Sequence, residues 1–210
     1  MPSSLNLAGV FSDALCEHIT IIRRLAAQQD AFERAATLIT DALVRGNKVL
    51  WCGNGGSAAD SQHLAAELVG RFRRRRSGLP SIALTTDTSI LTAVANDFGY
   101  DEVFSRQVEA LCQPDDVVVG ISTSGNSKNV CAALQKARQL KGLTVAMTGR
   151  NGGRIATLAD VCIRVPSTDP ARIQEAHILF GHMLCEWIEL ATCIREAVAG
   201  GGGAYDPGAA

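Results

Sequence analysis

Five short apolar runs alternate with longer stretches of helical periodicity, and this alternation restricts the chain to one class of fold. The runs are rich in valine and largely continuous, which is typical of strands buried on both faces of a parallel sheet. Strands are expected at Lys48–Cys52, Ser81–Thr85, Val117–Ser122, Thr144–Thr148 and Val161–Val165. Helices are expected near residues 57–72, 88–95, 101–112, 127–140 and 153–159, with a last one from Ala171 to Ala199. This order predicts a doubly wound α/β fold.

The segments that flank this repeat extend the domain at both ends. Apolar residues recur at helical spacing from Phe11 to Arg45, which predicts two helices that break near Gln28–Asp30 and stop at Gly46. We therefore divide the chain into N-terminal helices (1–46), an α/β domain (47–199) and a glycine-rich tail (200–210) that is expected to be disordered. With 210 residues, 47% of them hydrophobic, the chain can bury a substantial core.

Composition argues against several classes of partner and compartment. A net charge of −1 predicts no nucleic-acid partner, and the lack of an 18-residue apolar run or signal-peptide pattern predicts neither a membrane span nor export. The seven cysteines show no C-x-x-C spacing, which favours reduced thiols in a cytoplasmic protein. Most lie in apolar segments and are expected to be buried: Cys52, Cys131, Cys162 and Cys185. The basic run Arg73–Arg76 is interpreted as a solvated helix end.

The stretch from Val49 to Glu67 carries the strongest functional signal. A glycine-rich turn, Gly53–Ser57, joins a buried strand to a helix, whose first N–H groups are free to bind an anion. His63 and Glu67 follow at i,i+4 and project from one face of that helix. Each feature alone has an ordinary structural explanation, as close helix–strand packing or a solvated surface pair. Together they predict acid–base chemistry on a small phosphorylated molecule.

A second strand end carries a similar signal. The segment Ser122–Ser127 holds four hydroxyl side chains before a helix, more than an N-cap needs, and hydroxyls with N-terminal amides can hold a phosphate without a lysine. Ligands of open α/β sheets bind at the carboxyl ends of the strands, where both segments are expected. Because Gly53–Ala58 also fits the relaxed dinucleotide fingerprint, a nicotinamide enzyme is an alternative; the next strand's acid, Asp87, comes later than that fingerprint requires.

Several motifs together resemble the phosphoheptose isomerases, which are sugar-isomerase (SIS) domain proteins. The resemblance covers about residues 10–195. Its motifs are Cys52–Ser57, His63–Leu68, Ala95–Gly99, Gly120–Ser127, Thr148–Gly149, Gly152–Gly153, Arg172–His177 and Gly181–His182. The resemblance implies a flavodoxin-like five-stranded sheet, a homotetramer with active sites at subunit contacts, and no nucleotide cofactor. It also implies conversion of D-sedoheptulose 7-phosphate to D-glycero-D-manno-heptose 7-phosphate through an enediol.

The resemblance further implies the roles of individual residues. Glu67 and His182 are expected to do the acid–base work, and one Zn²⁺ per subunit is expected on His63, Glu67, Gln174 and His182. The implied substrate-binding residues are Asn54, Gly55, Gly56, Ser57, Arg71, Asp97, Ser122, Thr123, Ser124, Ser127, Asp169 and Gln174.

Two further alternatives stay open at this point. A histidine on an apolar helix is by default a core residue, so the spacing around His182 does not by itself make it a ligand. Some SIS proteins are not catalytic, including a tetrameric relative that binds the bacterial replication initiator but lacks the acid–base pair. The presence of both Glu67 and His182 favours an enzyme.

Overall fold

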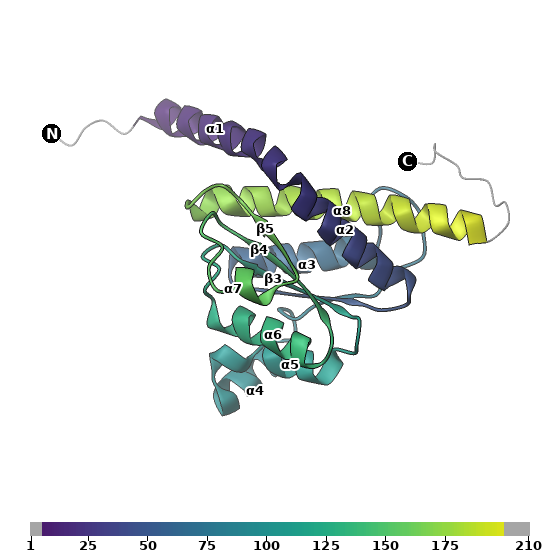
Figure 1. Cartoon of the computed structure of the whole chain (residues 1–210). Helices are drawn as coiled ribbons and strands as arrows, with labels where there is room; N and C mark the ends of the chain where they lie inside the picture. Colours follow the sequence, from purple (N-terminus) through teal and green to yellow (C-terminus); the bar gives the residue numbers. More distant parts are fainter. Residues whose placement is uncertain (1–5, 200–210) are drawn as a thin grey trace.

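The computed structural model describes residues 6–199 as an α/β sandwich with helices on both faces of one sheet (Figure 1). The sheet has five parallel strands in the order β2-β1-β3-β4-β5, the flavodoxin-like order that the family resemblance implies. The strands are β1 (Val49–Gly53), β2 (Ser81–Ala83), β3 (Val117–Ser122), β4 (Leu143–Thr148) and β5 (Val161–Arg164). The tail over residues 200–210, expected to be disordered, lies outside the described residues.

The helices form two layers around this sheet. One layer packs α2 (Gln29–Val44), α3 (Gly56–Val69) and the long α8 (Pro170–Ala199) against the sheet, and the other contains the helices that follow β2, β3 and β4 (Figure 1). These are α4 (Thr88–Phe98), η2 (Tyr100–Glu102), α5 (Ser105–Leu111), α6 (Lys128–Gln139) and α7 (Ile155–Leu158). The helix expected over 101–112 is thus split in two, because the fully buried Val103 and Phe104 interrupt it to fill the core.

The N-terminal helices are arranged as the apolar periodicity predicts. Helix α1 (Leu7–Arg24) joins α2 through the short 3₁₀ helix η1 (Leu25–Gln28), which begins three residues before the expected break at Gln28–Asp30. Helix α2 buries one face in the core, whereas α1 has no buried residue and projects beyond the sandwich (Figure 1). His18 of α1 contacts Glu175 of α8 at 2.7 Å, and Arg172 donates to the Ala14 carbonyl at 2.5 Å. These polar contacts attach α1 to the start of α8.

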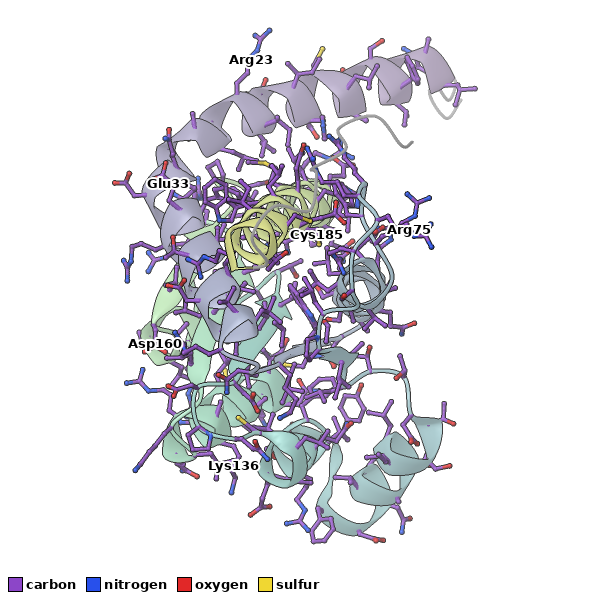
Figure 2. The ribbon with its side chains drawn as sticks, turned by 90° about the vertical axis from the view of Figure 1, so that its right-hand side faces the viewer. Arg23, Glu33, Arg75, Lys136, Asp160 and Cys185 are labelled. Carbon is purple, nitrogen blue, oxygen red and sulfur yellow. The ribbon has the colours of Figure 1, made fainter. Side chains whose placement is uncertain are left out.

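The basic run is not the solvated helix end that the sequence predicts. Helix α3 ends at Val69, and a loop follows in which the amides of Phe72, Arg73 and Arg74 donate to the Glu189 carboxylate of α8 at 3.1, 2.8 and 2.9 Å. The side chains of Arg76 and Glu189, each 2% exposed, form an ion pair at 3.3 Å. Arg75 does point away from the molecule (Figure 2), so the predicted exposure to solvent holds for it and is wrong for Arg76.

The burial of the four cysteines expected in the core agrees with the prediction, except at the edge of the sheet. All seven are free thiols, and Cys52, Cys131 and Cys185 are buried as predicted. Cys162 is only partly buried, because its strand, β5, is an edge of the sheet. Between residues 6 and 199, no helix combines the length and apolar character needed to cross a membrane.

Candidate active site

The glycine-rich turn carries the chain from β1 into α3. Gly55 adopts a φ of +58°, a conformation that side chains rarely take, and Ser57 is buried at the first turn of the helix. The amides of Ser57 and Ala58 already donate to the carbonyls of Asn54 and Gly55 at 3.1 and 3.0 Å. The turn therefore has fewer amides available for an anion than the sequence pattern predicts.

Helices α3 and α8 run side by side and approach closely at two glycines. A Cβ on Gly56 would lie 2.5 Å from Nε2 of Gln174, and a Cβ on Gly181 would lie 2.4 Å from a methyl carbon of Leu64. Glycine at these positions lets the amide of Gln174 rest on the start of α3. It also lets the next part of α8 press against the middle of α3, where His63 lies.

This contact brings three of the four predicted metal ligands together. Nε2 of His63 lies 3.0 Å from Nε2 of His182 and 3.2 Å from a carboxylate oxygen of Glu67. The ligand atoms of the three residues all lie within 4.8 Å of one another. His63 is exposed and the other two are partly buried, so the cluster is open to solvent on one side. We refer to these three residues as the His–Glu–His cluster.

The donor atoms of the His–Glu–His cluster fit a divalent cation. Nε2 of His63 has two neighbours, Nε2 of His182 and a carboxylate oxygen of Glu67. Because this nitrogen carries at most one proton, it cannot donate a full hydrogen bond to both of them. Two ligand atoms bound to zinc at about 2.0–2.1 Å in a tetrahedron lie about 3.3 Å apart, close to the 3.0 and 3.2 Å separations in the cluster. Two imidazoles and a carboxylate are also a common zinc ligand set.

Gln174 lies on α8 beside the glycine-rich turn. It precedes His182 by eight residues, about 12 Å of helix rise, and its amide rests on Gly56. Its position suits the other predicted role, a contact with substrate at the glycine-rich turn.

The two histidines of α8 have different surroundings. His177 is fully buried, and burial lowers its pKa to about 4, so its imidazole is neutral at pH 7. His182 faces the cluster and stacks on the Phe72 ring, with ring centroids 5.5 Å apart and planes at 25°. The core histidine of this helix is therefore His177, and the alternative that His182 is a core residue is wrong.

The hydroxyl-rich loop after β3 lies at the neighbouring strand end. The hydroxyls of Ser122 and Ser127 are 2.9 Å apart, Thr123 is partly buried and Ser124 is exposed. A Cβ on Gly125, whose φ is +70°, would lie 2.1 Å from the Gly152 carbonyl, so only glycine lets the loop after β4 support this one. Strands β1 and β3 are neighbours in the parallel sheet. The glycine-rich turn after β1 and the hydroxyl-rich loop after β3 therefore lie side by side at the carboxyl ends of the strands.

The remaining predicted substrate-binding residues make local contacts or are exposed. Asp97 is exposed on α4 and accepts from the Asn96 amide at 2.8 Å, and Arg71 is exposed in the loop after α3. Asp169 caps α8 by accepting from the Ala171 amide at 2.8 Å. The side-chain amide of Asn54 is hydrogen-bonded to Asn129.

Three residues near the site were not predicted from the sequence: Phe72, Asn129 and Tyr100. Phe72 was hidden inside a basic run, where its single apolar side chain was the only available signal. Asn129 and Tyr100 contact Asn54 from elements distant in sequence, and neither belongs to a local pattern that would indicate this contact.

The sheet carries a glycine-rich turn and a hydroxyl-rich loop at neighbouring strand ends, and two of the three residues of the His–Glu–His cluster lie on the helix that begins at the first of them. This arrangement is typical of a class of proteins that act on small phosphorylated ligands. Comparison with known proteins identifies the family. Residues 16–149 match the family of SIS domains. The phosphoheptose isomerase of Aquifex aeolicus is 60% identical over 161 residues, which are 77% of this chain and 84% of that protein.

Solved structures agree with this comparison. A phosphoheptose isomerase from Neisseria gonorrhoeae has a TM-score of 0.84 and 44% identity, covering 88% of this chain and 100% of its own. One from Francisella tularensis has a TM-score of 0.85 and 36% identity, with coverages of 89% and 100%. The chain therefore belongs to the phosphoheptose isomerase family of SIS-domain proteins, and its enzyme class is sugar-phosphate isomerase, an intramolecular oxidoreductase.

Proposed function

We propose that this enzyme converts D-sedoheptulose 7-phosphate to D-glycero-D-manno-heptose 7-phosphate through an enediol. The observation that carries the proposal is the His–Glu–His cluster beside the glycine-rich turn, in a chain of the phosphoheptose isomerase family. Isomerisation moves a proton between C1 and C2 and needs proton transfer on the two oxygens. A carboxylate with two imidazoles at about 3 Å can supply both.

The proposed roles follow from the surroundings of each side chain. Glu67, partly buried on α3, takes the proton from one carbon and returns it to the other. His182, fixed by stacking on Phe72, exchanges protons with the sugar oxygens and assists ring opening. The hydroxyls of the loop after β3 hold the phosphate, with Ser122, Thr123, Ser124 and Ser127 as donors. Holding the phosphate end positions the distant carbonyl at Glu67.

The remaining predicted residues are proposed to bind the rest of the sugar. Gln174, resting on Gly56, lies beside Gly55 and Ser57 of the turn and offers an amide to a hydroxyl. Arg71 and Asp97 are exposed and free to contact substrate. Asp169 contributes its second carboxylate oxygen, since the first caps α8.

Loss of the phosphate provides the direct test of this function. Incubation with sedoheptulose 7-phosphate is expected to yield an aldose 7-phosphate that NMR detects. Unphosphorylated sedoheptulose is expected to react with a kcat/KM at least about 10²-fold lower, because two charge-assisted hydrogen bonds of about 1.5 kcal/mol each would be absent. Equal kcat/KM for the two sugars would contradict the phosphate assignment, and absence of any product from the phosphorylated sugar would contradict the proposed function.

We also propose a divalent metal, with zinc first, on His63, Glu67 and His182. When bound there, it would polarise the carbonyl oxygen and stabilise the negative charge of the enediolate. Gln174, whose amide lies against Gly56, is the proposed fourth ligand. A carboxylate that serves as a ligand is a weaker base, so the metal and the proton compete for Glu67.

Removal of the metal tests this assignment. Exhaustive chelation is expected to lower activity and added zinc to restore it, and His63→Ala is expected to lower the zinc content measured by elemental analysis. His18→Ala, which removes a histidine outside the cluster, serves as the matched control and is expected to retain zinc. Full activity of a chelated, metal-free protein would leave the cluster as a purely organic acid–base site.

We further propose a cytoplasmic homotetramer with active sites at subunit contacts. Helix α1 exposes large apolar side chains, including Phe11 at 66% and Leu15 at 47%, and an apolar cavity of about 690 Å³ lies between η1, α2 and α8. Exposed apolar surface of this extent is typical of an interface. Seven free thiols suit a reducing compartment. Light scattering is expected to give a tetramer; a monomer at micromolar concentration would contradict this assembly.

A further inference from the structure

The side chain of Asn54 is fixed by two residues that have no role in the mechanism above. Its Nδ2 donates to Oδ1 of Asn129 at 2.9 Å, and its Oδ1 accepts from Nδ2 of Asn129 at 2.8 Å. The Tyr100 hydroxyl donates to the same Oδ1 of Asn54 at 3.3 Å. Asn54 immediately precedes Gly55 in the glycine-rich turn, so these contacts lie at the edge of the proposed substrate site.

The orientation of both amides follows from one backbone group. The amide N–H of Val130 points to Asn129 at 2.9 Å, and a backbone N–H can only donate, so the atom that it meets is the oxygen of Asn129. The nitrogen of Asn129 must then face Asn54 and donate to it. The atom of Asn54 that accepts is its oxygen, and its nitrogen faces the oxygen of Asn129. The backbone at Val130 thus determines the orientation of Asn54.

This network leaves Asn54 with one unused polar group. Its oxygen accepts from both Asn129 and Tyr100, which matches the two lone pairs of a carbonyl oxygen. Its nitrogen carries two hydrogens, of which Asn129 takes one. One N–H therefore remains, and it can only donate.

We propose that Asn129 and Tyr100 are positioning residues, which hold Asn54 so that it presents a single N–H donor to an oxygen of the sugar phosphate. This inference rests on the proposed function. Asn129, 3% exposed and two residues after Ser127, connects the turn after β1 with the hydroxyl-rich loop after β3. Tyr100, 59% exposed, approaches from the segment that follows Asp97. The two partners thus join three segments that surround the substrate site.

The near-isosteric variant Asn129→Asp tests the orientation of Asn54. It keeps the acceptor for Val130 but replaces the Asn129 nitrogen with a second oxygen. The Asn54 oxygen then faces a carboxylate oxygen in either orientation of its amide, so the N–H of Asn54 is expected to lose its fixed direction toward the substrate. Because the oxygen of the sugar phosphate then loses its donor, KM for the sugar phosphate is expected to increase about tenfold or more, with a smaller change in kcat. Tyr100→Phe removes only the exposed hydroxyl, and the expected increase in KM is about two- to fivefold.

Coupling to Asn54 distinguishes positioning from a general structural role. In the background of Asn54→Ala, both Asn129→Ala and Tyr100→Phe are expected to change KM less than twofold, because the residue on which they act is gone. If Asn129→Ala and Tyr100→Phe raise KM in that background by the same factors as in the unmodified enzyme, the inference is wrong. Tyr100→Phe gives the same comparison if Asn129→Ala folds poorly. Turnover of the unmodified enzyme on sedoheptulose 7-phosphate, measured in parallel, tests the proposed function separately.

Discussion

Glutamine in place of Glu67 is expected to lower kcat by about 10²-fold or more while the fold persists. Loss of a positioned acid–base group typically costs 10²- to 10⁴-fold, since the substitution preserves shape but removes the atom that accepts the proton. Glu67 lies partly buried on α3 and contacts His63 at 3.2 Å. An amide can still donate to or accept from that histidine, so the geometry of α3 should be preserved. The rate is measured with sedoheptulose 7-phosphate and the fold by circular dichroism.

A second glutamate provides the control for this change. Glu186 lies on α8, pairs with Arg73 at 2.7 Å on the surface and belongs to no proposed site, so Glu186→Gln is expected to retain full activity. Zinc content measured on both variants separates loss of the base from loss of a ligand. A Glu67→Gln enzyme that binds zinc normally but turns over slowly identifies a proton carrier. Near-normal turnover would remove Glu67 from the mechanism.

The sheet could be predicted closely because its signal is local. A continuous run of valine and isoleucine reports burial on both faces, and β3 lies at Val117–Ser122 as predicted. The end of α3 was placed three residues too late, because the amides of Phe72 and Arg73 turn away from the helix to reach Glu189. Their partner is more than one hundred residues further along the chain. Gly70, the C-cap of α3, is a local stop signal, but nothing near Val69 in the sequence indicates the contact with Glu189.

The site could be predicted in part for the same reason. His63 and Glu67 are one helical turn apart, so their shared face follows from spacing alone. Whether His182 of α8 joins them or lies in the core depends on how that helix is rotated against the sheet, and periodicity allowed both interpretations. The structure places His177 in the core and His182 at the cluster. The contact of Gln174 with Gly56 likewise depends on the approach of two helices, which no local pattern reports.

Glu189 is expected to contribute strongly to the stability of the fold. Glu189→Ala should lower the free energy of unfolding by about 3–5 kcal/mol, the cost typical of removing one partner of a buried ion pair. The carboxylate is 2% exposed, pairs with the equally buried Arg76 and accepts three backbone amides of the loop over 72–74. Without it, the Arg76 guanidinium keeps its main-chain acceptors but loses its counter-charge, and three backbone amides lose their acceptor. Urea unfolding monitored by circular dichroism measures the change.

The matched substitution Glu186→Ala, one turn earlier on α8, separates burial from charge. Its carboxylate is 43% exposed and pairs with Arg73 on the surface, so its loss is expected to change the free energy of unfolding by less than about 1 kcal/mol. Equal effects of the two substitutions would contradict a buried clamp at Glu189. The clamp also bears on catalysis, because it holds the backbone of Phe72, whose ring stacks on His182. At a temperature where the Glu189→Ala variant is still folded, its kcat should therefore fall as well, since the loop that orients His182 has lost its anchor.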